Sequence, residues 1–339
     1  MHRKFLPYLC CPETQKPLLL EVIEETSSGF IKAGVLSTED GLHQYSICEG
    51  IPRFVKCEEY ADSFGREWEM FPQVQFQHQN MDKAMRDHTE KMFYDITEWD
   101  KNELKKHTVV EFGSGAGRFL DIVHSAQGDD GLVIGLELSG AADVARKNFG
   151  ENCNVLIVQG DALQPPFFTD IMDFVYSIGV LHHTPLPAKG LKEMMRVAKV
   201  GGNVSVCVYN SQCPYYAAPS IFGMRKLINL LKKKIGVAKA YTIALWYSKF
   251  AGYFLYYIDW IVSKIPFIGG NSVKFLRQYM YALSTLPDTQ WRILDTFDAI
   301  TPTYASTHSP EEIEFWLKEF GCTEYHNTRF APASYTAIK

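Results

Sequence analysis

Short apolar runs alternate with segments of helical spacing along the middle of the chain, from residue 108 to residue 210. The apolar runs are rich in Val, Ile, Leu and Phe and predict five strands, at 108–111, 132–138, 154–159, 174–177 and 203–209. Helical segments fall between them, and we expect the one at 187–198 to end at the Gly201-Gly202 pair. Strands that alternate with helices in this way are typical of a mostly parallel α/β sheet.

Other patterns precede and follow this region. Residues 1–57 carry short apolar runs split by Ser-Gly and Asp-Gly turns, which predict a small β-rich unit. Residues 58–107 are polar and aromatic and predict a helical lead-in. After residue 210 the alternation ends, and we expect residues 211–300 to form a helical insertion.

The last part of the chain carries a helix start signal. Ser309 is followed by Pro310, and Glu312 stands three residues after the serine, a spacing that predicts a capped helix. Apolar runs at 322–329 and 334–338 predict two final strands. We therefore expect residues 301–339 to complete the central sheet.

Composition and charge narrow the class of protein. The 339 residues are 46% hydrophobic and 22% charged, which is ordinary for a folded globular chain. The net charge of −5 disfavours a general nucleic-acid binder. The eight cysteines form no CxxC pair, and the first residues hold no apolar core of a signal peptide. We therefore expect reduced thiols in a cytoplasmic protein.

The stretch VVEFGSGAGRFL follows the first strand of the α/β region and holds the clearest candidate site. Gly113, Gly115 and Gly117 stand at the carboxyl end of that strand, where open parallel sheets bind ligands, and glycine permits a positive φ there. The spacing G-x-G-x-G departs from the dinucleotide fingerprint G-x-G-x-x-G, and Glu111 stands two residues before the first glycine. Because a carboxylate repels phosphates, this turn favours a cofactor with a cationic amino-acid end.

Two later strands end in further acids. Glu137 ends the run VIGLE about twenty residues after Gly117, where a carboxylate can accept hydrogen bonds from ribose hydroxyls. Asp161, in QGDAL, can accept a hydrogen bond from an adenine amino group. Together these loops predict a site for a nucleoside that carries an amino acid.

The motifs EFGSGAG, GLELS, GDA and SIGVLHHTP, followed by LKEMMRVAKVGG, resemble the successive motifs of class I S-adenosylmethionine-dependent methyltransferases. The resemblance implies a Rossmann-like sheet of seven strands whose last strand runs antiparallel, with S-adenosylmethionine as cofactor. It places Glu111 at the methionine end, Glu137 at the ribose and Asp161 at the adenine. The cofactor-binding residues that it implies are Glu111, Gly113, Ser114, Gly115, Gly117, Glu137, Leu138, Asp161, Ala162, Ser177 and Ile178.

Methyl transfer needs an acceptor atom in line with the sulfonium carbon, and sometimes a base. His182 and His183 follow the fourth strand, where the acceptor should approach, and His183 is the preferred candidate for the base. Tyr209 ends the fifth strand and is expected to face the mouth of the pocket. Each histidine could instead only pack the loop, since alignment and electrostatics can carry much of such a reaction.

The N-terminal stretch LCCPETQKPLLL, with QYSICEGIPRFV after it, resembles the small zinc-ribbon-like unit found as an activator or a fused partner of methyltransferases. Thr14 stands where the second cysteine of a CPxC knuckle belongs. Since Cys10, Cys11, Cys48 and Cys57 lack standard zinc spacing, we expect a degenerate unit that holds no metal.

Two helical regions are expected beside the pocket. The lead-in EEYADSFGREWEMF resembles a flap over the cofactor in the same fused family. Residues 211–280 hold ten Lys or Arg and one acid, Asp259, although the whole chain is acidic. They could form a lid with solvated lysines, or lie on an anionic membrane with Trp246 and Trp260 at the interface. Lys249 and Asp259 interrupt the apolar run, which disfavours a spanning helix.

The sequence does not determine the oligomeric state, but it predicts a function. We expect an S-adenosylmethionine-dependent methyltransferase that acts on a small molecule, a sugar or a lipid-linked acceptor by O- or N-methylation. Two alternatives stay open, a catalytically silent S-adenosylmethionine-binding module and a tRNA methyltransferase, though the acidic core offers no evident path for RNA. The glycine spacing and Glu111 disfavour a nicotinamide oxidoreductase.

Overall fold

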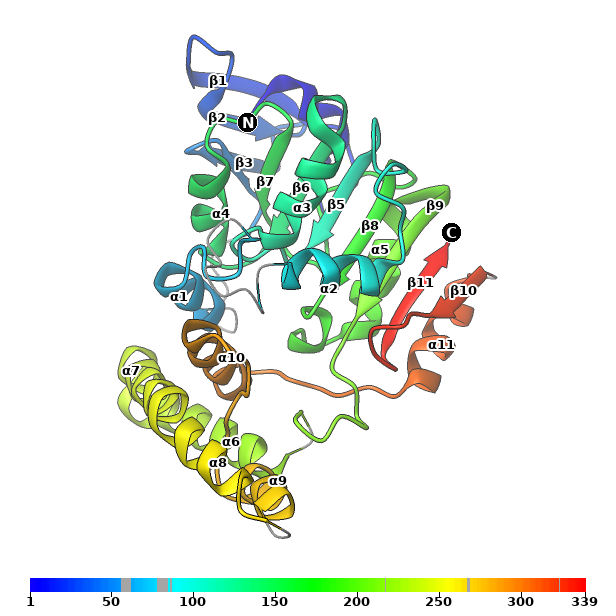
Figure 1. Ribbon diagram of the computed structural model, residues 1–339. Helices are drawn as coiled ribbons and strands as arrows, with labels where there is room; N and C mark the ends of the chain where they lie inside the picture. Colours follow the sequence, from blue (N-terminus) through cyan, green and yellow to red (C-terminus); the bar gives the residue numbers. More distant parts are fainter. Residues whose placement is uncertain (56–61, 78–84, 86, 217, 267–268, 323) are drawn as a thin grey trace.

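The computed structural model describes residues 1–339 except 56–61, 78–84, 86, 217, 267–268 and 323 (Figure 1). A sheet of eleven strands runs through the molecule in the order β1-β2-β3-β4-β7-β6-β5-β8-β9-β11-β10. Two hydrophobic cores pack against this sheet. The helices of the insertion form a separate layer at the lower end of Figure 1, away from the N-terminal strands.

Seven strands form the central part of the sheet and confirm the predicted α/β fold. Strands β7, β6, β5, β8 and β9 run parallel, and β11 pairs antiparallel with both β9 and β10. The last strand is thus antiparallel, as the resemblance implied. The seven strands are β5 Thr108–Phe112, β6 Leu132–Glu137, β7 Val155–Gln159, β8 Met172–Ile178, β9 Ala198–Cys207, β10 Glu324–Asn327 and β11 Ser334–Ile338.

Helices connect these strands and flank them. The predicted cap at the end of the chain is confirmed, because Ser309 Oγ accepts a hydrogen bond from Glu312 N at 3.3 Å. The helices are α1 Asp62–Met70, α2 His88–Thr97, α3 Arg118–Gln127, α4 Ala141–Phe149, α5 Pro187–Val197 and α11 Pro310–Glu319, with short 3-10 turns at Arg3–Tyr8, Gly128–Asp130 and Leu181–His183.

The N-terminal strands extend the central sheet, which the sequence did not predict. These strands are β1 Leu19–Glu25, β2 Ile31–Ser37, β3 Gln44–Cys48 and β4 Ile51–Arg53. Arg53 pairs with Gln159 of β7, and its guanidinium donates to the Gln159 side chain at 2.7 Å and to Asp143 at 2.7 Å. Phe54 N also donates to Gln159 O at 2.8 Å. These contacts join the N-terminal strands edge to edge with the central strands in one sheet.

The helix predicted at 187–198 is confirmed as α5, but the Gly201-Gly202 pair is not the signal that ends it. Helix α5 ends at Val197, and β9 begins at Ala198, so Gly201 and Gly202 lie inside a strand rather than after a helix. Gly201 has a φ of +79°, and its N donates to Lys339 O at 2.9 Å. The glycine pair marks an irregular start of the strand, where a register shift occurs against β8.

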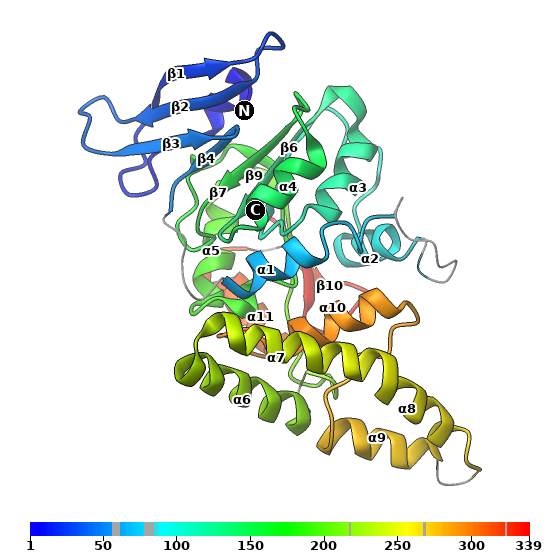
Figure 2. The same ribbon diagram turned by 90° about the vertical axis from the view of Figure 1, so that its left-hand side faces the viewer.

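The insertion is helical, and its last helix, α10, is the one nearest the sheet (Figure 2). Its helices are α6 Pro219–Ile235, α7 Val237–Phe250, the π-helical turn η6 Ala251–Leu255, α8 Tyr256–Ser263, α9 Gly269–Tyr279 and α10 Thr289–Ile300. Helix α7, the π-turn and α8 follow one another as a continuous helix. Within the part of the chain that the structure describes, no helix combines the length and the apolar character needed to cross a membrane.

The π-turn is fixed against α10 by one buried cation and one glycine. Arg292 of α10 donates from Nε to Gly252 O at 3.3 Å, and its guanidinium lies 3.6 Å from the centre of the Tyr256 ring. A Cβ at Gly252 would stand 2.8 Å from Ile293 Cγ1, so glycine is needed for this close approach. The long helix is therefore attached to the helix that faces the candidate site.

Candidate functional site

A cavity of 1120 Å³ lies between the carboxyl edge of the parallel strands and the helices α1, α9 and α10. Loops after β5, β6, β7, β8 and β9 form its sheet side, and the lead-in and the insertion form the other side. Small-molecule sites commonly measure about 300–1,000 Å³, so this cavity has room for two adjoining ligands.

The glycine turn lines one end of the cavity. Gly113, Gly115 and Gly117 have φ angles of +79°, +53° and +95°, which L side chains rarely adopt. A Cβ at Gly113 would stand 2.3 Å from Val180 Cγ1, and one at Gly115 would stand 2.9 Å from Trp68 Nε1. The turn therefore requires glycine both for its conformation and for the approach of its neighbours.

Glu137 holds this turn from the neighbouring strand. Its Oε2 accepts a hydrogen bond from Gly115 N at 2.9 Å, and its Oε1 accepts from Ser139 N at 2.9 Å and Ser139 Oγ at 2.7 Å. A carboxylate can accept about four hydrogen bonds, so Glu137 can still serve a ligand in the cavity that it lines. Sequence reasoning had missed its contact with the glycine turn.

Glu111 places a buried carboxyl group at this end of the cavity. The residue is 2% exposed, and Tyr176 OH donates to its Oε2 at 3.1 Å. Burial raises the pKa of Glu111 well above its ordinary value, while the Tyr176 hydrogen bond and Arg118 oppose that shift. A ligand cation placed beside it would favour the ionised form, which suits a ligand with a protonated amino group.

Most of the predicted cofactor-binding residues line the cavity, namely Glu111, Gly113, Ser114, Gly115, Glu137, Leu138, Asp161, Ala162 and Ile178. Gly117 and Ser177 lie outside its lining. Gly117 stands at the start of α3, and Ser177 Oγ donates to Phe112 O at 2.9 Å. Ser114 Oγ is buried without a hydrogen-bond partner among the described residues, so it can bond to a ligand. This donor and acceptor set fits a nucleoside that carries an amino acid.

His183 and Tyr209 line the cavity, and His182 lies behind them. His183 Nδ1 donates to Tyr304 O at 2.9 Å, so Nε2 is left as an acceptor, buried and without a partner in the described part of the chain. Burial lowers the pKa of His183 to about 3. His182 Nδ1 accepts from Tyr209 N at 3.2 Å, and the two rings stack 3.5 Å apart. His182 therefore supports Tyr209, and His183 presents a neutral acceptor.

Three carboxylates line the end of the cavity that the helices form, and the sequence analysis had missed all of them. Asp295 and Asp298 come from α10, and Glu67 comes from α1. Tyr209 OH donates to Asp298 Oδ2 at 3.1 Å, and Tyr215 OH donates to Asp295 Oδ2 at 3.4 Å. We call this end, with Glu67, Tyr209, Tyr215, Tyr216, Asp295 and Asp298, the carboxylate chamber.

The aspartates of the carboxylate chamber titrate near neutrality. Burial raises the pKa of Asp295 and that of Asp298 to about 6. Burial also raises the pKa of Glu67 well above its ordinary value, and Asp298 adds to that shift. A sequence signal for Asp295 and Asp298 exists in TQWRILDTFDAI, where two acids three residues apart share one face of a largely buried helix.

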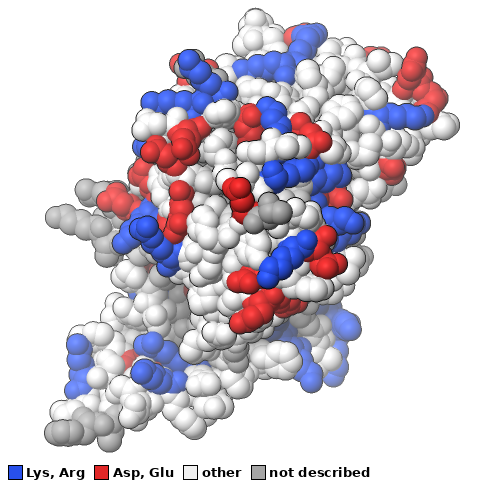
Figure 3. Space-filling model, turned by 90° about the vertical axis from the view of Figure 1, so that its right-hand side faces the viewer, with Lys and Arg blue, Asp and Glu red and all other residues white. Residues whose placement is uncertain are grey.

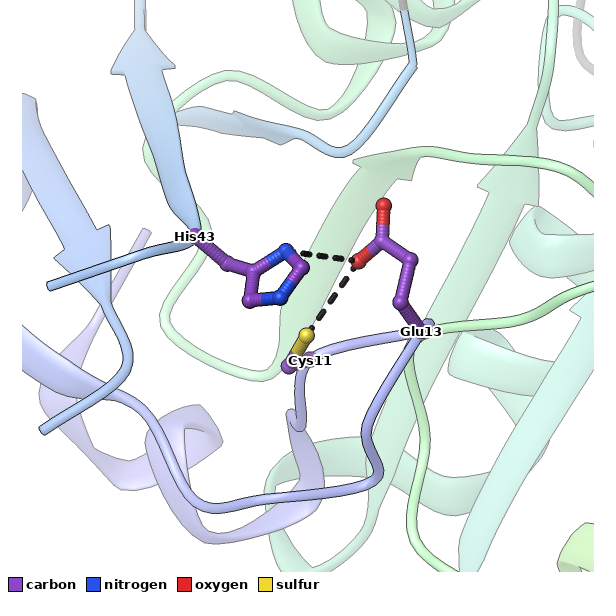
Figure 4. Close-up of side chains that lie close together, drawn as sticks. All are labelled: Cys11, Glu13 and His43. Atoms are coloured by element: carbon purple, nitrogen blue, oxygen red, sulfur yellow. Dashed lines mark hydrogen bonds and ion pairs between the residues drawn. The ribbon is translucent and has the colours of Figure 1, made fainter. Parts of the chain in front are cut away.

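Among the described residues, the N-terminal cysteines considered as metal ligands do not form one cluster. Cys10 and Cys11 are buried, Cys48 is exposed, and Cys57 lies outside the described residues. Cys11 instead lies beside Glu13 and His43 (Figure 4), with Cys11 Sγ 3.2 Å from Glu13 Oε2 and His43 Nδ1 3.5 Å from the same oxygen. Tyr45 OH contacts both Cys11 and Glu13. The likeness to a zinc ribbon stays a prediction.

Comparisons with known proteins agree with this geometry. A family model described as methyltransferase domain matches residues 110–206. Demethylmenaquinone methyltransferase of Bacillus licheniformis is 28% identical over 47% of this chain and 66% of its own length. That of Lysinibacillus sphaericus is 31% identical over 45% of this chain and 69% of its own length. The chain spans about half to two thirds of the first curated relatives that it matches.

A solved structure matches more of the chain at lower similarity. It is a Methanococcus maripaludis protein assigned to the S-adenosyl-L-methionine-dependent methyltransferases, with 16% identity over 84% of this chain and 94% of its own. The TM-score of this match is 0.43, so the two folds agree only loosely.

Proposed function

The chain belongs to the S-adenosylmethionine-dependent methyltransferases, and we propose that it transfers a methyl group to a hydroxylated aromatic small molecule of the quinol class. One observation carries the proposal. The cavity continues from the glycine turn into the carboxylate chamber, so a cofactor and an acceptor can lie side by side.

The glycine end holds the cofactor in this proposal. Glu111 pairs with the amino group of the methionine part, Glu137 accepts from the ribose, and Asp161 accepts from the adenine. Ser114 Oγ supplies a further hydrogen bond. S-adenosylmethionine, when bound, supplies an electrophilic methyl group on a sulfonium centre.

The carboxylate chamber binds the acceptor. Tyr216 and Tyr209 line the cavity and stack with ring centres 3.7 Å apart, and this aromatic lining suits an aromatic acceptor. His183 Nε2, buried and without a partner among the described residues, accepts a hydrogen bond from one of the two hydroxyls of the quinol. Both relatives are named for demethylmenaquinone, a quinone, and a quinol is the reduced form of a quinone.

Asp298 takes the proton of the acceptor hydroxyl. A base works best when its pKa lies near the working pH, and the pKa of Asp298 is about 6 whereas that of His183 is about 3. In this proposal Asp298, rather than the predicted His183, is the base that removes the proton of the reacting hydroxyl, and His183 orients the acceptor through its other hydroxyl. Removing this proton makes the oxygen, and the ring carbon next to it, more nucleophilic.

The test is incubation of the full chain with S-adenosylmethionine labelled at the methyl group and a panel of hydroquinones with and without prenyl tails. We expect a product that carries the label, and the carbon spectrum of that product tells ring methylation from the O- or N-methylation expected from sequence. Asp298→Asn should lower the rate of product formation by about a hundredfold, and the exposed Asp129→Asn serves as the matched control. Cofactor binding without any labelled product from the panel or from a cell extract would favour a silent binding module instead.

A further inference from the structure

The long helix formed by α7, η6 and α8 exposes large apolar side chains along one side. Its exposed members include Ile243, Trp246, Phe250, Tyr253, Tyr257 and Trp260. They recur at intervals of three and four residues, which places them in one stripe along the helix. Trp246 is 71% exposed and Trp260 is 54% exposed, so this stripe is not buried against the rest of the chain.

The opposite side of the same helix is packed with small residues. Ala240, Ala244, Ser248, Ala251 and Gly252 are buried, at similar spacing. A helix of a water-soluble domain usually buries its large apolar side and exposes polar residues. This helix has the reverse arrangement, which is typical of a surface that contacts another apolar phase.

Lysines accompany the apolar stripe. Lys239, Lys249 and Lys264 are exposed on the same helix, and Lys264 Nζ lies 5.5 Å from the centre of the Trp260 ring. Residues 211–280 carry ten basic residues against one acid, and that acid, Asp259, is buried and paired with Arg277. In Figure 3 the lower end of the molecule shows basic side chains almost alone, whereas the upper body mixes both signs.

Helix α9 connects this surface to the cavity. Lys274, Arg277 and Gln278 of α9 line the cavity, whereas Phe275 and Tyr279 of the same helix are exposed. Arg277 Nε donates to Asp259 of α8 at 3.0 Å, so the wall of the cavity and the long helix are joined. The apolar surface and the cavity thus adjoin one another through a single helix.

We propose that the α7–α8 stripe is a docking surface for an anionic lipid bilayer, on which the helix lies parallel to the membrane. Aromatic rings with lysines beside them match the interface, where rings enter the headgroup layer and ammonium groups meet lipid phosphates. One consequence rests on the proposed function: the same surface would deliver a prenylated acceptor from the membrane to the cavity. The docking itself requires no acceptor.

Flotation of the full chain with vesicles tests the docking without cofactor or acceptor. One vesicle type is phosphatidylcholine alone, and the other contains about a third phosphatidylglycerol. We expect binding to the anionic vesicles at low salt, weakened at high salt. Failure here would overturn the docking surface and leave methyl transfer in solution untouched, so the two proposals fail separately.

Two double variants separate the apolar and the ionic parts. Trp246→Ser with Trp260→Ser should lower vesicle partitioning by about tenfold or more, since interfacial aromatic area is lost. Lys249→Gln with Lys264→Gln should lower it by roughly tenfold and reduce its salt dependence. Matched controls are Leu42→Ser with Phe315→Ser, which are exposed apolar residues elsewhere, and Lys147→Gln with Lys192→Gln.

The controls should bind vesicles like the unchanged chain, and thermal melting should show that all variants fold. Equal loss in the controls would overturn the proposal, because binding would then lack a defined surface. Sedimentation of the unchanged chain as a dimer that Trp246→Ser with Trp260→Ser dissociates would also overturn it, since the stripe would then be an interface between two copies.

Discussion

At one end of the cavity the wall is mostly backbone, and at the other end it is side chains brought from distant helices. Gly113 and Gly115 leave room at the first end, and Glu137 fixes the turn through a backbone amide. At the second end Asp298 comes from α10, and Tyr209 comes from the chain after β9. The first end can recognise a constant ligand through a rigid turn, whereas the second can change its specificity by substitution.

The largest expected effect is at the glycine end. Glu137→Ala removes the acceptor of the Gly115 amide and two bonds to Ser139, so the turn loses its support. Losing several charge-assisted bonds at a buried site should lower kcat/KM for S-adenosylmethionine by about a hundredfold or more. Initial rates against cofactor concentration measure this, with the exposed Glu103→Ala as control. If the KM for S-adenosylmethionine stays unchanged in Glu137→Ala, the glycine turn does not depend on Glu137 for cofactor binding.

A large effect of another kind is expected in the carboxylate chamber. Asp298→Asn keeps the shape of the side chain and removes its capacity to take a proton. The value of kcat should fall by about a hundredfold, the range for general bases, while the KM for cofactor stays within about twofold. Parallel loss of cofactor binding would mean that the two ends are not separable.

A moderate effect concerns pH and stability. The pKa of Asp295 and that of Asp298 rise from the ordinary value near 4 to about 6, so the native state holds protons that the unfolded chain has released in this interval. Stability without ligand should therefore fall as the pH rises from about 4 to about 6. Glu67 acts in the same direction, and Arg118 lowers the pKa of both aspartates.

Thermal melting across this pH range measures the effect. The double variant Asp295→Asn with Asp298→Asn should flatten the fall in Tm by about 2 °C or more, given the size of the chain. The rate of methyl transfer should move the opposite way and rise with pH through about 6, because the ionised form of Asp298 is the base. Identical melting profiles for the variant and the unchanged chain would count against buried ionisation in the chamber.

The smallest expected effect is that of Tyr209→Phe. The Tyr209 hydroxyl donates to Asp298 and lowers the pKa of that carboxyl, so its removal should raise this pKa. The acid limb of the rate profile should then move to higher pH, and kcat should fall by about three- to tenfold, the worth of one hydrogen bond. Tyr304→Phe, which keeps the carbonyl that binds His183, is the control. A rate profile that stays in place would show that Tyr209 does not act through Asp298.

The glycine end could be predicted from sequence because its signals are local. Glu111, Gly113 and Gly115 stand within five residues, at the end of one predicted strand and in the turn directly after it. The contact of Glu137 with the Gly115 amide could not be predicted, since it depends on the register of two strands. Sequence spacing alone does not report such pairings.

The carboxylate chamber depends on how the chain folds back. Strands β5 to β9 lie between Glu67 and Asp298 in the chain. The packing of α1 against α10 brings the two residues to one cavity. The joining of the N-terminal strands to β7 was missed for the same reason, because a single residue pair, Arg53 with Gln159, makes the junction. The Gly201-Gly202 pair was misread as a helix stop because glycine marks irregular strands as well.

Calorimetric titration with S-adenosylhomocysteine, performed on the unchanged chain, on Asp298→Asn and on Glu137→Ala, tests the separation of the two ends most directly. The account predicts one micromolar site in the unchanged chain, the same affinity in Asp298→Asn, and no measurable binding in Glu137→Ala. Binding that survives in Glu137→Ala, or that disappears in Asp298→Asn, would contradict it.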